Sequence, residues 1–204
     1  MAEQIDNLTQ QNRQLLQQHQ PSQGSLSKTT KNSLLIDFCE RFSPSYQLEV
    51  CNDVDECYFG SYPTLAKLKA EYGKNAAMAF IIPQLQDLAT YCGCSTKLGE
   101  KQYMECAFVI STEFFYLKIT ELMLFCHRFK AGKYGRFYGS VDPLVITTSL
   151  HDFLKERSAA YEKHDKEEEE HREMEHRKKH PPMCYTEWVE IKTIIAMYNS
   201  DYTV

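Results

Sequence analysis

The chain has 204 residues, of which 43% are hydrophobic and 25% charged, and its formal net charge is −5. This length predicts one domain with appendages or two small domains. The acidic balance excludes a uniformly basic, nucleic-acid-coating surface, but it leaves room for a local basic patch.

The sequence predicts a cytoplasmic protein. None of its eight cysteines forms a Cys-x-x-Cys pair, and several lie within apolar helical patterns, where a free thiol behaves as a small hydrophobe. The N-terminus lacks the basic and apolar regions of a signal peptide. No run of 18 apolar residues exists, so we expect no membrane span and no membrane partner. Reduced cysteines in a reducing compartment follow from this.

Residues 1–32 predict a polar, glutamine-rich arm and linker. Ile5, Leu8, Asn12 and Leu15 follow a/d spacing, as in a short coiled coil. Because about two heptads are marginal for an isolated helix, the arm is either a short coiled coil or a disordered segment. Residues 21–32 have the composition of a flexible linker.

Residues 33–161 predict a compact, bundle-like helical domain in an all-α protein. A first helix opens at Ser33 and stops before Pro44. Residues 46–60 are irregular and predict a loop with at most one short strand. Their acidic patch lacks the glycine and the terminal glutamate of an EF-hand, so we expect a solvated turn there.

Four segments of this domain have helical periodicity: 63–73, 76–91 with a kink or break at Pro83, 99–115, and 121–130 capped by Thr120. Their apolar side chains predict the core. These side chains are Leu65, Leu68, Tyr72, Phe80, Ile81, Leu85, Leu88, Tyr103, Cys106, Val109, Ile110, Phe114, Leu122, Leu124, Phe125 and Phe129.

Asp142 and Pro143 predict the start of a long helix, with the carboxylate at the N-cap and proline at the first position. Nothing breaks this helix before Pro181, a length of roughly 57 Å. Only its first half has an apolar face. Residues 162–182 therefore predict a charged helical stalk, stabilised by acid-first i,i+4 pairs.

Residues 183–204 predict an amphipathic C-terminal helix that begins at Thr186. It carries Trp188, Ile191, Ile194, Ile195 and Tyr198 on one stripe. Such a stripe is buried either against the chain's own core or in a partner's groove.

The candidate site is the loop 128–138, which collects basic and aromatic side chains without an acid. Positive charge for phosphates and rings for bases are what a single-stranded nucleic acid site needs. The alternative is that Gly132, Gly135 and Gly139 serve as a helix cap and turns, and that the aromatics close the core. The candidate contact residues are Arg128, Lys130, Lys133, Tyr134, Arg136, Phe137 and Tyr138.

We expect no catalytic residue, metal or cofactor. His171, His176, His180 and Cys184 lie on a solvated, charged segment that lacks a convergent geometry for metal. Cys92-Gly93-Cys94 lacks redox-pair spacing, and no side chain has the setting of a catalytic nucleophile.

Two stretches, 59–73 (FGSYPTLAKLKAEYG) and 114–157 (with FKAGKYGRFYGSVDP), resemble a family of unknown function from Bacteroidota genomes. That family is carried on phages and other mobile elements, and the resemblance covers about residues 58–164. It implies no activity and no functional residues. The helix, the FKxGxYGxFYG turn and the charged tail also resemble phage replication accessory proteins of the helicase-loader type.

The sequence therefore favours a non-enzymatic accessory or adaptor protein of a phage or mobile element, acting in DNA replication. In this hypothesis the loop 128–138 contacts single-stranded nucleic acid or a replication protein. The alternative is a structural or self-assembling interaction protein, a homo-oligomer that uses its terminal helices.

Overall fold

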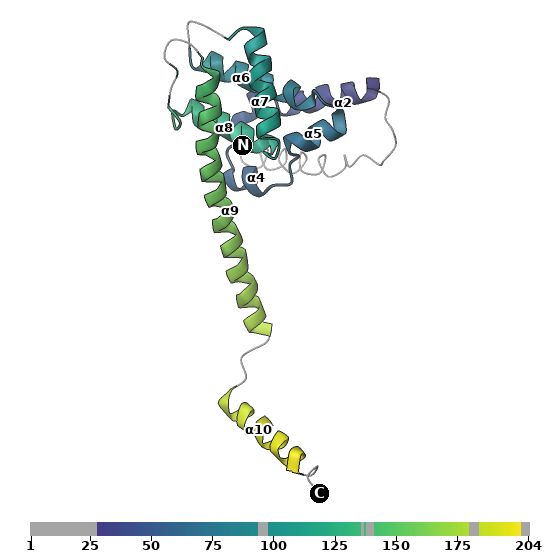
Figure 1. The fold of residues 1–204 in the computed structure, drawn as a ribbon, viewed down its shortest axis with the longest axis vertical. Helices are drawn as coiled ribbons and strands as arrows, with labels where there is room; N and C mark the ends of the chain where they lie inside the picture. The colour runs from purple at the N-terminus through teal and green to yellow at the C-terminus, as the bar shows by residue number, and fades with distance from the viewer. Residues whose placement is uncertain (1–27, 94–97, 136, 138–140, 180–183, 201–204) are drawn as a thin grey trace, which may run out of the picture. The chain divides into compact units, whose positions relative to one another are not determined.

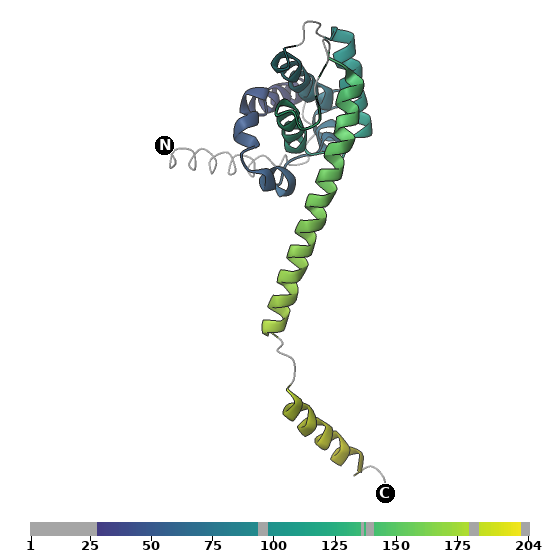
Figure 2. The same ribbon diagram turned by 90° about the vertical axis from the view of Figure 1, so that its left-hand side faces the viewer.

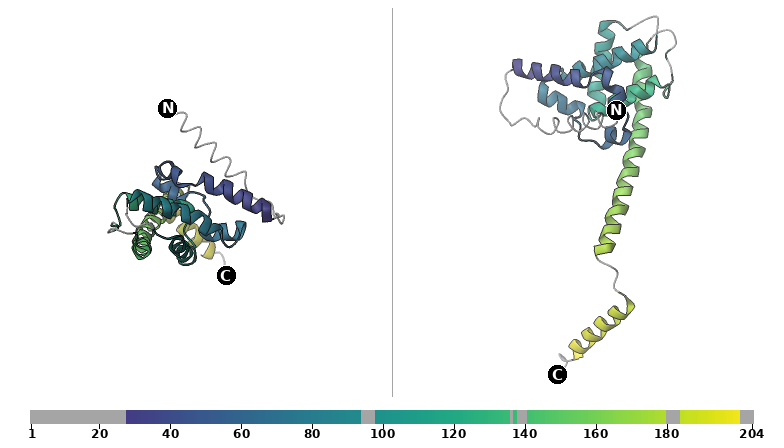
Figure 3. Two further views of the ribbon diagram at one scale, coloured as in Figure 1. Left: turned by 90° about the horizontal axis from the view of Figure 1, so that it is seen from above. Right: turned by 180° about the vertical axis from the view of Figure 1, so that it is seen from behind.

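The computed structural model describes residues 28–93, 98–135, 137, 141–179 and 184–200. Every regular element among them is a helix, so the predicted all-α fold is confirmed. Contacts divide the chain into two compact units, 1–145 and 146–204. Figures 1 to 3 follow the chain by colour, with the helices of the first unit in purple to teal, α9 in green and α10 in yellow.

The first unit begins with α2 (Lys28–Arg41), which starts earlier than the predicted Ser33. The predicted loop at 46–60 is wrong. This region holds the 3-10 helix η1 (Pro44–Tyr46) and two short helices, α3 (Gln47–Val50) and α4 (Val54–Phe59). The acidic patch accounts for α4, because the Asp53 carboxylate accepts the Glu56 N–H at 2.9 Å and so caps this helix.

The next two helices follow the sequence pattern closely. α5 (Leu65–Tyr72) is capped by Thr64 and ends at Gly73, whose φ of 111° suits glycine. α6 (Ala76–Tyr91) has the predicted bounds, and it runs without a break through Pro83. Proline inside a helix costs about 3 kcal/mol, whereas each fully buried Phe, Ile or Leu contributes about 1.5–3 kcal/mol. Because α6 buries several such side chains, burial outweighs the proline.

α7 (Glu100–Glu113) and α8 (Ile119–Lys130) complete the first unit. The predicted cap of α8 is wrong: its N-cap is Lys118, and the Glu121 carboxylate accepts the Lys118 N–H at 2.8 Å. The Thr120 hydroxyl instead donates to the Cys57 carbonyl at 2.8 Å. The Lys118 ammonium donates to the carbonyls of Tyr58 and Gly60 at 2.5 and 3.0 Å. These contacts fasten the start of α8 to α4.

The core of the first unit lies around α6, which packs against α5, α7 and α8 (Figure 1). Most of the predicted core side chains are buried, whereas Val109 is 40% exposed and lies outside the core. α8 is almost wholly buried. The segment before the loop 131–142 therefore rests on a packed scaffold.

The second unit contains most of α9 (Pro143–Lys179) and all of α10 (Tyr185–Ser200). The predicted start of α9 is confirmed, because Asp142 accepts the Leu144 N–H at 2.8 Å. Ile146, Leu150 and Phe153 are buried, and beyond them the surface of α9 is charged. Among the described residues, no helix combines the length and the apolar character that crossing a bilayer requires.

Candidate functional site

The candidate loop begins where α8 ends. The Gly132 N–H donates to the Phe129 carbonyl at 2.9 Å, and the Lys133 N–H donates to the Arg128 carbonyl at 3.1 Å. This pair of bonds is the Schellman motif, and Gly132 occupies its left-handed position with a φ of 80°. The role of Gly132 is therefore a helix cap, as the alternative reading of the loop predicted.

Arg128 is held by α4. Its guanidinium donates to the Tyr58 hydroxyl at 2.7 Å and lies 5.7 Å from the centre of that ring. Burial lowers the pKa of Arg128. The electrostatic interactions and hydrogen bonds with the hydroxyls of Tyr58 and Tyr134 raise this pKa by more than burial lowers it, so the net shift is upward. The guanidinium is thus a permanent cation that links α8, α4 and the loop.

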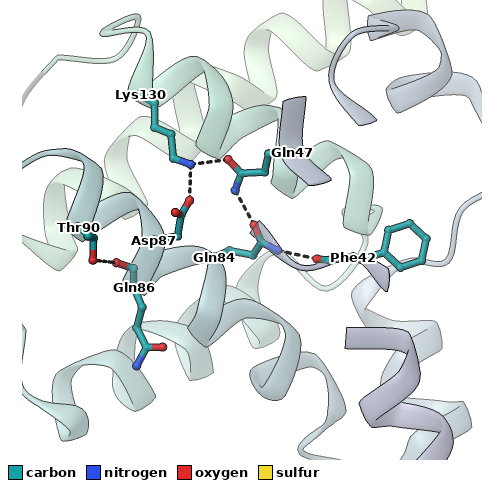
Figure 4. Close-up of polar contacts among 7 residues, drawn as sticks. All are labelled: Phe42, Gln47, Gln84, Gln86, Asp87, Thr90 and Lys130. Carbon is teal, nitrogen blue, oxygen red and sulfur yellow. Dashed lines mark hydrogen bonds and ion pairs between the residues drawn. The ribbon is translucent and has the colours of Figure 1, made fainter. Parts of the chain in front are cut away.

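Lys130 is held by a polar network at the end of α8 (Figure 4). Its ammonium forms an ion pair with Asp87 of α6 and donates to the Gln47 amide oxygen at 2.7 Å. Gln47 in turn donates to Gln84 at 2.6 Å, and Gln84 donates to the Phe42 carbonyl at 2.8 Å. Only 16% of the Lys130 side chain is exposed. Lys130 therefore joins three segments of the first unit.

Two loop aromatics continue the core. The Tyr134 ring stacks on Phe125 at 5.5 Å, and the Phe137 ring stacks on Phe129 at 5.1 Å between centroids. Stacking of this kind stabilises by about 0.5–1.5 kcal/mol beyond the area buried. One face of each ring is therefore engaged by protein and is not available to stack on a base.

Among the predicted contact residues that the structure describes, the exposed cation is Lys133. Arg136 and Tyr138 lie outside the described residues. The structure therefore brings Arg128, Lys130 and the two stacked aromatics to the end of α8, where they contact the protein itself. The sequence reasoning could not detect their partners, because Tyr58, Gln47 and Asp87 lie 43 to 83 positions away along the chain.

Two buried cysteines form a second polar cluster in the first unit. The thiols of Cys51 and Cys57 are hydrogen-bonded to each other, which raises the pKa of Cys51 and lowers that of Cys57. The Cys57 thiol also contacts the Val50 carbonyl at 3.2 Å. Within the described part of the chain, no three His, Cys, Asp or Glu side chains gather as a metal site would require.

A different candidate surface is the C-terminal helix. Its large apolar side chains are between 38% and 78% exposed. They are Tyr185, Trp188, Val189, Ile191, Ile194, Ile195, Met197 and Tyr198. The helix is well capped, since Cys184 and Glu187 exchange hydrogen bonds: Glu187 accepts the Cys184 N–H at 2.9 Å, and the Cys184 sulfur accepts the Glu187 N–H at 3.4 Å.

The sequence of this helix also contains a coiled-coil spacing of apolar residues, which the prediction of an amphipathic helix did not include. Trp188, Ile191, Ile195 and Tyr198 follow 3-4-3 spacing, which is the a/d pattern of a coiled coil. Two heptads are too few to stand out from an ordinary amphipathic helix. Because all four side chains are exposed in the structure, the pattern indicates a surface that another helix can cover.

The fold and the surfaces define an all-helical protein with a packed domain and an exposed apolar terminal helix. Residues 97–194 match a family of unknown function (DUF6633). The predicted resemblance to a family of unknown function is confirmed in this form, although the match lies further along the chain than 58–164 and spans just under half of it. No curated protein matches the chain, and no solved structure does.

Proposed function

We propose that the protein is a non-enzymatic, cytoplasmic adaptor whose C-terminal helix α10 associates with another protein chain. The observation that carries this proposal is the exposed apolar row of α10. A contiguous exposed apolar surface is typical of an interaction site. The charges of α10 favour a protein over an anionic membrane, because Glu187 and Glu190 outnumber Lys192.

The setting that we propose for this adaptor is DNA replication of a phage or other mobile element, in the manner of a helicase loader. The support is the resemblance carried by 129–143 (FKAGKYGRFYGSVDP) and by the charged helix that follows it. Accessory proteins of this kind act by bringing other proteins together, so they need a folded domain and an association surface rather than a catalytic site.

The association is tested by photo-crosslinking of the full chain in its host. A photoreactive phenylalanine analogue replaces Ile191 in α10, and the control replaces Met174, which is 55% exposed on the charged part of α9. We expect a discrete cross-linked protein from position 191 and none from position 174. If position 191 gives no protein adduct, the adaptor proposal fails.

A second candidate function, contact with single-stranded nucleic acid, is favoured by the turn after α8. Lys133 is exposed there. Apart from the glycines and their chain neighbours, no heavy atom of the described residues lies within 4 Å of the position that a Cβ would take at Gly132 or Gly135. A phosphate could therefore approach this backbone closely. The opposing observation is that Arg128 and Lys130 already bind Tyr58 and Asp87.

This candidate is tested by fluorescence anisotropy with a single-stranded oligonucleotide over a salt series. Lys133→Ala is compared with Lys101→Ala, which removes a lysine whose side chain is 88% exposed on α7. If the turn binds phosphate, only Lys133→Ala weakens binding, and it lowers the salt slope by about 1. Equal binding by both variants would exclude the turn.

A further inference from the structure

The exposed face of α10 contains an apolar seam with a charged side chain on each flank. When Trp188 and Ile195 are placed at a positions, Ile191 and Tyr198 fall at d positions. Their exposed fractions are 48%, 55%, 42% and 68%. A seam of this kind is the surface that one helix buries against another in a coiled coil.

The flanking charges of α10 complement each other between two chains. In this register Glu187 is a g position and Lys192 is an e position, five residues apart. In a parallel coiled coil, g of one helix faces the e position five residues later in its partner. A pair of identical chains therefore gains two symmetric Glu187–Lys192 ion pairs. An antiparallel pair brings g to g and e to e and gains neither.

The structure already places both side chains beside the seam. The Lys192 ammonium lies 4.8 Å from the centre of the Trp188 ring, so its stem covers the edge of the a position. The Glu187 carboxylate uses Oε2 to accept from the Cys184 N–H, which anchors it at the start of the helix. The g edge also carries Ile194, which is 61% exposed, so the apolar surface extends beyond the a and d positions on that side.

The geometry points to a second copy of this chain as the partner of α10, in a parallel and in-register two-helix pair. This inference rests on the proposed function, because it names the chain that occupies the same surface. Two heptads stabilise such a pair only modestly, so the association is reversible and concentration-dependent. Cys184 lies at the d position one heptad before Ile191, so the pair brings the two Cys184 thiols together.

The first test is sedimentation of the purified full chain up to about 1 mM, the range in which weak pairs form. We expect the mass to rise from 23.8 kDa to twice that value. Ile191→Asp should weaken pairing by more than about 100-fold. The matched control is Met197→Asp, which changes a 63% exposed side chain off the seam and should pair normally. A monomer at every concentration, or a mass of three or more chains, overturns the inference.

The second test distinguishes the parallel register. Glu187→Lys and Lys192→Glu each replace two attractive pairs with two repulsive ones, so each variant alone should pair about tenfold more weakly. An equimolar mixture of the two variants restores both attractions and should pair like the wild type. Unchanged pairing of each variant alone would indicate an antiparallel pair and overturn the inference.

The third test uses the thiols. A short bismaleimide should link two wild-type chains through Cys184 when the chain is paired, and Cys184→Ser should abolish this product. Absence of the link in a paired chain overturns the parallel arrangement. If the purified chain stays monomeric while position 191 cross-links a different protein in the host, the adaptor function stands and the self-pairing fails.

Discussion

Lys130 and Lys133 lie three residues apart and differ in what surrounds them. Lys130 is largely buried and paired with Asp87, whereas Lys133 is exposed. Breaking a partly buried, hydrogen-bonded pair leaves Asp87 and Gln47 without their cation, which costs about 1–3 kcal/mol.

We therefore expect Lys130→Met, which keeps the apolar stem, to lower the free energy of unfolding by about 1–3 kcal/mol. Lys133→Met should change it by less than about 0.5 kcal/mol. The midpoints of urea denaturation measure both values. Equal effects from the two substitutions would contradict the structural role assigned to Lys130.

The cysteine thiols differ in pKa, again because their surroundings differ. The pKa of Cys184 is lowered, first by the hydrogen bond from the Thr186 hydroxyl and then by the Glu187 N–H. Burial raises the pKa of Cys39 and of Cys106 to about 11, and that of Cys126 to about 12. A lower pKa means more thiolate at neutral pH, and the thiolate is the nucleophile.

Iodoacetamide at neutral pH should therefore alkylate Cys184 before Cys39, Cys106 and Cys126, measured by mass spectrometry of dilute, unpaired protein. The rate at Cys184 should level off at a lower pH than that of a free cysteine. Thr186→Val removes the hydroxyl, so it should move this pH profile upward. A profile unchanged by Thr186→Val would show that the hydroxyl does not stabilise the thiolate.

At the scale of one residue, the sequence reveals charge and aromaticity but not their partners. The absence of acids between Arg128 and Tyr138 suggested an open basic surface. The structure places Asp87 and Gln47 against Lys130, and both come from other segments. A local window contains no information on such contacts, because tertiary folding alone creates them.

Among the helices, α4 shows how a short element depends on its cap. It has six residues, yet it carries Cys57 and Tyr58, which are both buried. A helix of this length has little stability of its own, so its cap and its packing together maintain it.

We expect Asp53→Ala to lower the free energy of unfolding by about 1 kcal/mol, since the substitution removes the bond to the Glu56 N–H. Asp55→Ala, in the first turn of the same helix, loses only a dipole interaction and should cost about 0.3–0.5 kcal/mol. Thermal or urea unfolding compares the two. A larger effect at Asp55 would refute the capping role of Asp53.

The helices that the sequence predicts best are those in which every local signal agrees. α6 has the predicted bounds because a strong apolar pattern ends at Cys92 and Gly93, and burial outweighs Pro83. α3 and α4 were predicted as loop because neither is long enough to show a period. The Asp53 and Glu56 pair was the signal that could have identified α4.

Considered as a whole molecule, the chain has its buried core and its exposed apolar helix in different elements. The core belongs to α5 to α8 and their neighbours, whereas the apolar side chains of α10 are exposed. An exposed helix contributes little to the stability of a domain that it does not help to bury.

A chain that ends at residue 180 should therefore keep the melting temperature of the full chain in dilute solution, within about 2 °C. Circular dichroism at a helical wavelength measures this, with Leu85→Ala as a positive control for destabilisation of the core. Loss of several degrees on truncation would show that the last 24 residues stabilise the domain.

The hydrogen bonds around Lys130 have a fixed order of donors and acceptors. The Phe42 carbonyl can only accept, so Gln84 must turn its NH₂ group toward it and its oxygen toward Gln47 (Figure 4). Gln47 then has to turn its own oxygen toward Lys130. One main-chain oxygen thus sets the orientation of two amides, and the last amide can be satisfied only by a donor. Position 130 is consequently constrained to a hydrogen-bond donor by a residue 88 positions earlier in the chain.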